Sequence, residues 1–582
     1  MAQYLEIIRF VKPYAKQFTL GSLAKLAEAL LELLLPLLMA RIIDVGIPGA
    51  DLGYIQRMGV LMLLFSLAGL LLAGICQYFA AVTSQGSGTI IRNAIIEKIS
   101  TFSFSDLDRF GTSSLQNRVT SDVNNVQQAV AMTMRLVTRA PFICVGAVVM
   151  SVGIDPGLSL IFAVLIPVLG LIIYALVRKT SPLYRAVQKK LDAFALVVRE
   201  NLSGVRVIRA FARTGQENRR AHAAAAELAD STIRVTRLST LMNPATSIVL
   251  NLALIAILYL GASRVFSGRL LQGDLLALTT YSTQILYALL VIANLVVLFT
   301  KASASSSRIA EVLAVRPSIT YPAHSAPAPD PAAPAVRLEG VRFAYGGENA
   351  LEGVSFSLLP GETMGIVGVT GSGKSTVVNL IQRFYDPQRG AVLLFGAPVQ
   401  SYPRHALRAL IGVAPQNNVL FSGSIADNLR WGKRDATEEE MEQALRTAQC
   451  LDFVSALPGG VRAPVQEGGK NFSGGQRQRL AIARALIKRP RLLILDDSLS
   501  ALDYKTDLEL RRALARDLAG TTVIIVSQRI SSVLGAHRIL VLEQNGRPCG
   551  LGTHAELLEA CGPYREIYQS QTDSRGGAAA NV

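Results

Sequence analysis

The segment GVTGSGKST, residues 368–376, has the composition of a phosphate-binding loop. Its glycines let the backbone fold so that successive N–H groups point inward, at the positive end of the helix predicted to follow. Lys374 is spaced to reach the β and γ phosphates of a nucleotide, and Ser375 to bind Mg²⁺. The sequence therefore predicts an ATP and Mg²⁺ site. Its predicted ATP-binding residues are Gly368, Thr370, Gly371, Ser372, Gly373, Lys374, Ser375 and Thr376.

A second segment, RLLILDDSLSALD (residues 491–503), supplies carboxylates. The apolar run at its start predicts a central strand, and Asp496 follows at the carboxyl end of that strand. An aspartate in this position holds Mg²⁺ opposite a phosphate-binding loop. Asp497 stands one residue later, where the group that orients or deprotonates the attacking water is expected.

The elements that position these motifs begin after a linker. Residues 314–335 are rich in Pro and Ala and are expected to be extended. Residues 336–570 alternate short strands with helices, which predicts an α/β domain with a largely parallel sheet. Residues 571–582 are expected to form a disordered tail.

The part before the linker is expected to lie in a membrane. The chain has 582 residues, of which half are hydrophobic and only 17% charged, a balance unusual for a soluble protein of this length. Within residues 1–313 we predict six transmembrane helices and an all-α membrane domain. The predicted spans are 18–47, 58–82, 129–153, 157–178, 243–266 and 275–300.

Charge gives the expected orientation. The long loop from residue 178 to 240 contains thirteen Lys or Arg against five Asp or Glu. Such residues near membrane ends mark the cytoplasmic side, which places both long loops and both termini inside. The net charge of +16 is explained by attraction to anionic lipid, and no nucleic-acid-binding motif accompanies it. We predict a multi-pass protein of a bacterial plasma membrane.

A third motif suggests a family. FSGGQ, residues 472–476, matches the signature LSGGQ of ATP-binding cassette (ABC) proteins apart from its first residue. Six spans with two long internal loops, fused to one cassette, resemble half of an ABC exporter. In that family two cassettes meet head to tail, and each ATP lies between the P-loop of one and the signature of the other. The resemblance implies that Ser473, Gly474, Gly475 and Gln476 serve the ATP of a partner.

Further residues take roles from the same resemblance. Tyr345 matches the aromatic residue that stacks on adenine, and Gln416 matches the glutamine that contacts Mg²⁺ beside Ser375 and Asp496. Glu467 resembles the acidic residue that touches the internal loops, and Asp503 ends the loop that crosses the cassette interface. The internal loops themselves are matched by residues 110–126 and 201–217.

Two departures from the family pattern concern catalysis. The catalytic glutamate of the family is replaced by Asp497, and its switch histidine by Gln528. Aspartate is one methylene shorter, which moves its carboxylate by about 1.5 Å, and a displacement of about 1 Å can cost 10²-fold in rate. Glutamine can donate a hydrogen bond to the γ phosphate but carries no positive charge. We expect slow hydrolysis here and a non-identical partner that holds the competent site.

The alternatives are a homodimeric exporter and an ATP-binding regulator that gates a catalytic partner. The substrate is open between drugs, lipids and peptides. Charged and amide side chains within the predicted spans could line a substrate cavity or pair with one another, and structural pairing is favoured. The candidate cavity residues are Glu28, Glu32, Gln284 and Asn294.

Overall fold

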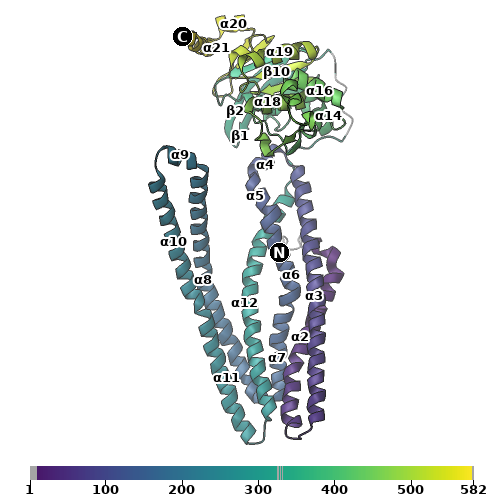
Figure 1. Cartoon of the computed structure of the whole chain (residues 1–582), viewed down its shortest axis with the longest axis vertical. Coiled ribbons are helices and arrows are strands. Elements are labelled where there is room, and N and C mark those ends of the chain that lie inside the picture. The colour runs from purple at the N-terminus through teal and green to yellow at the C-terminus, as the bar shows by residue number, and fades with distance from the viewer. Residues whose placement is uncertain (1–8, 324–326, 328–329, 331, 580–582) are drawn as a thin grey trace. The chain divides into compact units, whose positions relative to one another are not determined.

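The computed structural model describes residues 9–323, 327, 330 and 332–579. The chain forms two compact units, one of residues 1–101 and 111–315 and the other of residues 102–110 and 316–582 (Figure 1). Residues 324–326, 328–329 and 331 of the predicted linker, and residues 580–582 of the predicted tail, lie outside the described residues. Residues 571–579 of the predicted tail belong to α21, which ends at Ala579.

The first unit is built of long helices. Several of them are joined end to end through π-helical turns, so that the chain runs on with little change of direction (Figure 1). Its elements are η1 (Lys12–Tyr14), α2 (Ala15–Arg41), η2 (Ile42–Gly46), α3 (Leu52–Ser100), α5 (Thr112–Asn117), η3 (Arg118–Asp122), α6 (Val123–Met132), η4 (Thr133–Val137), α7 (Arg139–Ile154), α8 (Pro156–Ser203), α9 (Val205–Ala210), α10 (Thr214–Thr240), α11 (Met242–Phe266) and α12 (Gln272–Ala314).

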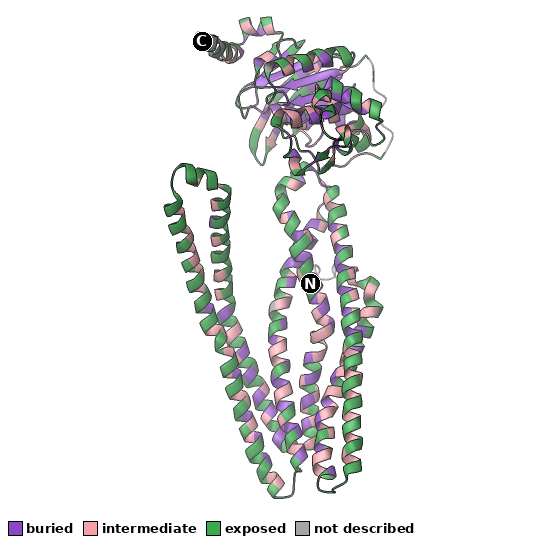
Figure 2. Ribbon diagram, in the orientation of Figure 1, coloured by how far each residue is buried: buried purple, intermediate pink, exposed green. Residues whose placement is uncertain are grey.

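Among the described residues, five helical stretches are long and apolar enough to cross a membrane: 52–100, 112–154, 156–203, 214–266 and 272–314. They contain the second to sixth predicted spans. The first predicted span falls on α2 and η2, where Lys25, Glu28, Glu32 and Arg41 lower the hydropathy, and the sixth crossing is not confirmed. Figure 2 shows much exposed surface on these helices, and leucines of α3 such as Leu63 and Leu70 are among it. Lipid is a solvent for such side chains.

The second unit contains three sheets. Its largest has six strands in the order β12-β11-β3-β10-β9-β6, with every neighbouring pair parallel except β11 with β12. A four-stranded antiparallel sheet has the order β2-β1-β4-β5, and β7 pairs with β8. The strands are β1 (Val336–Tyr345), β2 (Glu348–Leu358), β3 (Thr363–Gly368), β4 (Arg389–Leu394), β5 (Ala397–Pro398), β6 (Ile411–Ala414), β7 (Gly423–Ser424), β8 (Pro464–Val465), β9 (Leu492–Asp496), β10 (Thr522–Val526), β11 (Arg538–Leu542) and β12 (Pro548–Gly552).

Helices surround these sheets, as an α/β fold requires for strands that are apolar on both faces. They are α4 (Phe104–Phe110), α13 (Lys374–Ile381), η5 (Val399–Ser401), α14 (Arg404–Leu410), α15 (Ile425–Arg430), α16 (Glu438–Thr447), α17 (Leu451–Ser455), η6 (Gly460–Arg462), η7 (Glu467–Gly469), α18 (Gly474–Leu486), α19 (Tyr504–Asp517), η8 (Ile530–Ser532), α20 (His554–Ala560) and α21 (Gly562–Ala579).

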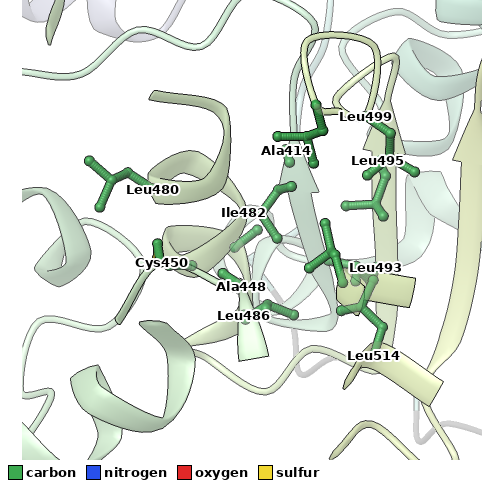
Figure 3. Packing of buried hydrophobic residues seen from close by; sticks show 14 of the residues in the cluster. Ala414, Ala448, Cys450, Leu480, Ile482, Leu486, Leu493, Leu495, Leu499 and Leu514 are labelled. Carbon is green, nitrogen blue, oxygen red and sulfur yellow. The ribbon is translucent and has the colours of Figure 1, made fainter. Parts of the chain in front are cut away.

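Alternate residues of β9 enter two separate cores. Leu493 and Leu495 pack with α18 and α19 on one face of the sheet, as Figure 3 shows. Leu492 and Ile494 join the other core, with α13 and the antiparallel sheet. Both faces of the strand are therefore buried, which explains the continuous apolar run before the two aspartates. The carboxyl end of β9 is held firmly in place as a result.

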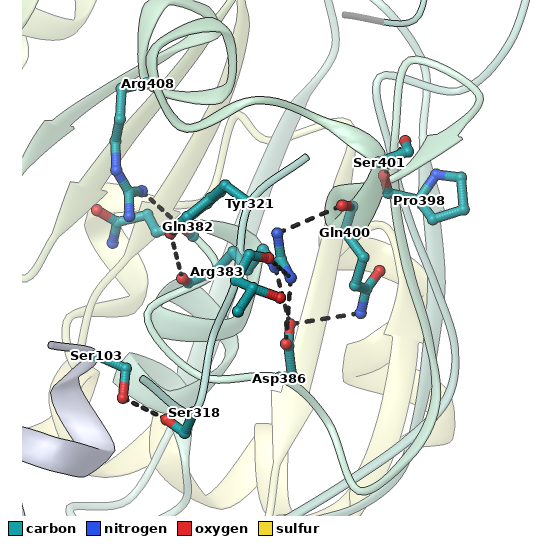
Figure 4. Close-up of polar contacts among 11 residues, drawn as sticks. Ser103, Ser318, Tyr321, Gln382, Arg383, Asp386, Pro398, Gln400, Ser401 and Arg408 are labelled. Atoms are coloured by element: carbon teal, nitrogen blue, oxygen red, sulfur yellow. Dashed lines mark hydrogen bonds and ion pairs between the residues drawn. The ribbon is translucent and has the colours of Figure 1, made fainter. Parts of the chain in front are cut away.

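The short segment of residues 102–110 belongs to the second unit. Phe104 of α4 lies with its ring centroid 4.3 Å from that of Phe384, and the Tyr385 hydroxyl donates to Asp108 at 2.6 Å. The Ser103 and Ser318 hydroxyls lie 2.5 Å apart (Figure 4). This segment ends at Phe110, the first residue of the first internal loop that the family resemblance predicts. Phe104 supplies the apolar contact of this segment with Phe384 and Tyr385.

Candidate nucleotide site

The phosphate-binding loop connects β3 to α13, as the sequence predicts. Gly373 caps α13 in the left-handed region, with φ +85°, and a Cβ there would lie 2.3 Å from the Ala350 carbonyl oxygen. At Gly368 a Cβ would lie 2.3 Å from the Leu542 carbonyl oxygen. Neither position has room for a side chain. The loop is thus a tight backbone cradle at a helix N-terminus, which suits a phosphate group.

Lys374 lies inside this loop. Its ammonium donates to the carbonyl oxygens of Gly368 at 2.9 Å and Val369 at 2.7 Å. Burial lowers the pKa of Lys374, and the neighbouring Asp497 and Asp496 oppose that shift. The Ser372 hydroxyl lies 3.4 Å from the same ammonium. A buried cation held by neutral carbonyls and a hydroxyl gains more from an anionic ligand than an exposed cation does. The loop and Lys374 therefore fit a nucleotide phosphate.

Asp496 and Ser375 stand together beside the loop. β10 lies between β3 and β9 in the sheet, so the carboxyl ends of the three strands meet at one edge. The Ser375 hydroxyl donates to Asp496 Oδ1 at 3.3 Å. Burial raises the pKa of Asp496, with Ser375 opposing the shift. A hydroxyl and a carboxylate are the oxygen ligands that Mg²⁺ prefers, so this pair fits the predicted metal.

Asp497 has an unusual backbone and an unsatisfied carboxylate. Its φ is +47°, and its N–H donates to the Val526 carbonyl at 2.9 Å. Gln416 Nε2 reaches Asp497 Oδ2 at 3.5 Å, whereas the buried Oδ1 has no hydrogen-bond partner in the described part of the chain. Burial raises the pKa of Asp497, with Lys374 and Arg529 opposing the shift. An unpartnered buried oxygen is costly, and a water or ligand would relieve it.

One cavity of about 350 Å³ collects these residues. All the predicted ATP, Mg²⁺ and catalytic positions line this cavity except Gly368, which is the last residue of β3. Glu348, Asn349, Ala350 and Val526 also line it and were not predicted. The Gly-Gly turn after Tyr345 signals a hairpin between β1 and β2 that could have placed the first three. The predicted residues in its lining are Tyr345, Thr370, Gly371, Ser372, Gly373, Lys374, Ser375, Thr376, Gln416, Asp496, Asp497 and Gln528.

The signature residues lie outside this cavity. Ser473 and Gln476 form a capping box at the start of α18, in which each side chain accepts from the backbone N–H of the other residue. Ser473 and Gly474 are exposed. The preceding Phe472, which replaces the leucine of the family pattern, is buried against the core. The signature is locally complete and available to a ligand other than this chain's own nucleotide.

The remaining predicted interface residues are at the surface. Asp503 caps α19 by accepting from the Thr506 N–H at 3.1 Å, and Glu467 is exposed in η7. Arg529, next to Gln528, donates to the Leu502 carbonyl at 3.3 Å. The loop that carries Asp503 is therefore tied to the loop that carries Gln528.

The candidate substrate residues fall in the helical unit and are only partly brought together. Glu32 and Gln284 line a cavity of about 230 Å³ with Arg139 and Tyr287. Arg139 donates to Glu32 at 2.6 Å, while Glu28 pairs with Lys25 at 2.7 Å. Glu28 and Asn294 do not line this cavity. Ion pairing thus satisfies both glutamates within the chain, and Gln284 Oε1 is left buried without a described partner.

Comparison with known proteins agrees with this geometry. The ABC transporter transmembrane region matches residues 18–289, and the ABC transporter cassette matches residues 351–500. An uncharacterized ABC transporter ATP-binding protein of Mycobacterium tuberculosis is 38% identical over 567 residues, which cover 97% of each chain. The chain belongs to the ABC transporter family. It has the architecture of an ABC exporter half-transporter, with a helical transmembrane domain fused to an α/β cassette.

Two further comparisons extend over the whole length of this ABC transporter. The uncharacterized ABC transporter ATP-binding protein YfiB of Bacillus subtilis is 36% identical over 571 residues, covering 98% of this chain and 99% of the relative. A solved structure of a bacterial Atm1-family ABC exporter with ATP bound has a TM-score of 0.78 over 97% of this chain, at 23% identity. The family couples ATP hydrolysis to transport across the membrane.

Proposed function

We propose that this chain is the degenerate-site half of a heterodimeric ABC exporter. The observation that carries the proposal is the lining of one cavity, where Asp497 and Gln528 stand beside an intact P-loop. The site keeps what holds ATP and Mg²⁺, and it lacks the two side chains that the family uses for rapid hydrolysis. The intact signature at Ser473–Gln476 would complete a competent site on the partner.

Each residue of the nucleotide site has its own proposed role. Bound Mg²⁺ would neutralise phosphate charge, and Ser375, Asp496 and Gln416 would be its ligands. The loop N–H groups and Lys374 bind the phosphates, and Tyr345 lies where it can stack on the base. Asp497 is the nearest candidate to orient water. Its short side chain holds the carboxylate farther from the point of attack than glutamate would, and this distance makes it a poor base there although burial raises its pKa.

For transport we propose an amphipathic or hydrophobic substrate, moved by alternating access. ATP binding favours the closed pair of cassettes only through its higher affinity for that state. A slow site keeps the cassettes associated while the partner's site turns over. The proposed orientation places the cassette and both chain termini in the cytoplasm of a bacterial cell, with membrane lipid around the helical unit.

The decisive experiment is ATPase turnover of the full-length chain in lipid nanodiscs, alone and with candidate partner half-transporters. We expect little turnover alone and rapid turnover with a partner that has the catalytic Glu and the switch His. The double variant Asp497→Glu, Gln528→His should raise turnover of the chain alone by about 10-fold or more, since it restores both catalytic groups.

Three outcomes distinguish the alternatives. Vigorous turnover of the unmodified chain as a homodimer contradicts the proposal. A complex in which the partner's own Glu-to-Gln change abolishes turnover agrees with it. A complex that gates an ion flux or another activity, with turnover unrelated to substrate movement, favours the regulator. The variant Lys374→Ala, which removes the phosphate ligand, is the control for hydrolysis by contaminants.

A further inference from the structure

The C-terminal helix reaches the loop that carries Gln528. Gln571 of α21 donates from its side-chain amide to the Gln528 carbonyl at 2.8 Å. The amide oxygen of the same side chain accepts from the Ile530 N–H at 2.9 Å. Gln571 lies 41 residues after Ile530 and 43 residues after Gln528 in the sequence. Its side chain thus fixes the backbone on both sides of Arg529.

The structure gives both partners of this contact firm support. Ile530 is 1% exposed and begins η8, and the Ser527 N–H donates to the Ile366 carbonyl of β3 at 3.1 Å. At the base of α21, Tyr564 is fully buried and its hydroxyl lies 2.8 Å from Nδ1 of His554. Gln571 therefore links α21, which Tyr564 anchors, to the backbone of residues 528–530. Gln528 and Arg529, which lie between the buried Ser527 and Ile530, are exposed.

The Gln528 side chain needs such a link. It lines the nucleotide cavity, while its backbone lies beyond the last residue of β10 and outside the sheet ladder. A flexible backbone at this point would spread the amide over many positions, and catalytic or binding geometry tolerates little displacement. The hydrogen bond from Gln571 to the Gln528 carbonyl restricts the ψ angle of Gln528. The hydrogen bond from the Ile530 N–H to Gln571 restricts the turn that follows.

We propose that Gln571 is a positioning residue that holds Gln528 against the terminal phosphate of ATP. The inference rests on the proposed function, in which Gln528 contacts that phosphate. It adds a residue from a helix outside the nucleotide cavity to the machinery that distinguishes ATP from ADP. The amide is suited to this task because it both donates and accepts, which leucine cannot do and glutamate does only in part.

The test measures binding of Mg-ATP and Mg-ADP to the full-length chain in nanodiscs, by competition with a fluorescent ATP analogue. The readout is the ratio of the two affinities. Gln571→Leu should lower the preference for ATP by about three- to tenfold, the loss expected when a charge-assisted hydrogen bond is weakened. Gln571→Glu keeps the acceptor for the Ile530 N–H but not the donor to the Gln528 carbonyl. It should lower the preference for ATP over ADP less than Gln571→Leu does. ADP affinity should hold in both.

Gln569 offers a matched control, since it is the same residue type on the same helix and is exposed. Gln569→Leu should leave the ratio unchanged. Gln528→Ala removes the side chain and keeps the backbone carbonyl, and it should lower the ratio at least as much as Gln571→Leu. In the double variant Gln528→Ala, Gln571→Leu, the second change should add little, because Gln571 acts through Gln528.

The outcomes separate this inference from the proposed function. If Gln528→Ala lowers the ratio and neither Gln571 variant does, the positioning role is wrong while the function of Gln528 stands. If Gln528→Ala has no effect, both are wrong. Additive effects in the double variant, or a loss of ADP affinity as large as that of ATP affinity, overturn the inference by showing a general structural role instead.

Discussion

At the scale of single residues, Asp497 has the most consequential environment. Its left-handed backbone suits aspartate or asparagine, whose short polar side chains tolerate that region. A longer glutamate carries an extra cost of about 1 kcal/mol there. The restoring variant Asp497→Glu is therefore expected to gain activity and lose some stability. Sequence comparison alone reveals the missing methylene but not the strained backbone beneath it.

Asp497→Asn tests the electrostatic side of this environment. Because burial raises the pKa of Asp497, the folded state holds the proton up to a higher pH than the unfolded state does. The wild-type cassette therefore loses stability as pH rises from the pKa of Asp497 in the unfolded state to its pKa in the folded state. The loss is complete above the folded-state pKa. We expect the neutral Asn to stabilise the cassette by about 1 kcal/mol at neutral pH. This advantage should vanish near pH ~4.

Thermal unfolding of both proteins across that pH range provides the measurement. The matched control is Asp435→Asn, at an exposed aspartate of the same cassette. It should show no such pH-dependent gain. An Asp497→Asn protein that is less stable than wild type at neutral pH would show that attraction to Lys374 and Arg529 outweighs burial.

At the scale of elements, the sequence predicted correctly those helices and strands that carry a motif beside a clear apolar pattern. The P-loop, the strand before Asp496 and the signature helix are found at their predicted places because glycine spacing and apolar runs are local signals. The contact of Gln571 with the Gln528 loop could not be predicted, since it depends on how α21 folds back. Nor could the grouping of α4 with the cassette be predicted from polarity, because Phe104, which packs on Phe384, lies before the matched loop.

Phe104→Ala tests what holds α4. Phe104 is 43% exposed, so its ring pair with Phe384 rather than burial accounts for much of its contribution. Losing that pair should cost about 1 kcal/mol and raise hydrogen exchange of the α4 amides about fivefold. The β9 amides should be unaffected. Ser105→Ala, at an exposed neighbour in the same helix, is the control. Equal acceleration in α4 and β9 would instead mean that the whole cassette had lost stability.

At the scale of the whole molecule, the two halves of the nucleotide machinery in this chain are expected to serve different ATP sites. The P-loop and Asp497 would serve the slow site, and Ser473 would serve the competent site of the partner. The signature does not line the cavity that contains Lys374, although Gln478 of the same helix α18 donates to the Asp497 carbonyl at 3.2 Å. Variants in the two places should therefore affect a complex unequally.

Ser473→Ala in the complex with a competent partner is the sharpest test of this asymmetry. Loss of the capping hydroxyl costs α18 about 1 kcal/mol and, under the proposed function, would remove a side-chain donor to the partner's nucleotide. We expect turnover to fall by about 10²-fold, as when a transition-state donor is removed. Asp497→Asn in the same complex should change turnover less than about twofold, because the proposed slow site would contribute little.

Ser473→Thr keeps a capping hydroxyl and should retain most turnover, which separates loss of the hydroxyl from loss of the helix. Circular dichroism and ATP binding at this chain's own site should be unchanged in Ser473→Ala, since Ser473 does not line that site. Equal losses of turnover from Ser473→Ala and Asp497→Asn would mean two equivalent sites. That result would assign the chain to a symmetric exporter, because only equivalent sites depend on both residues alike.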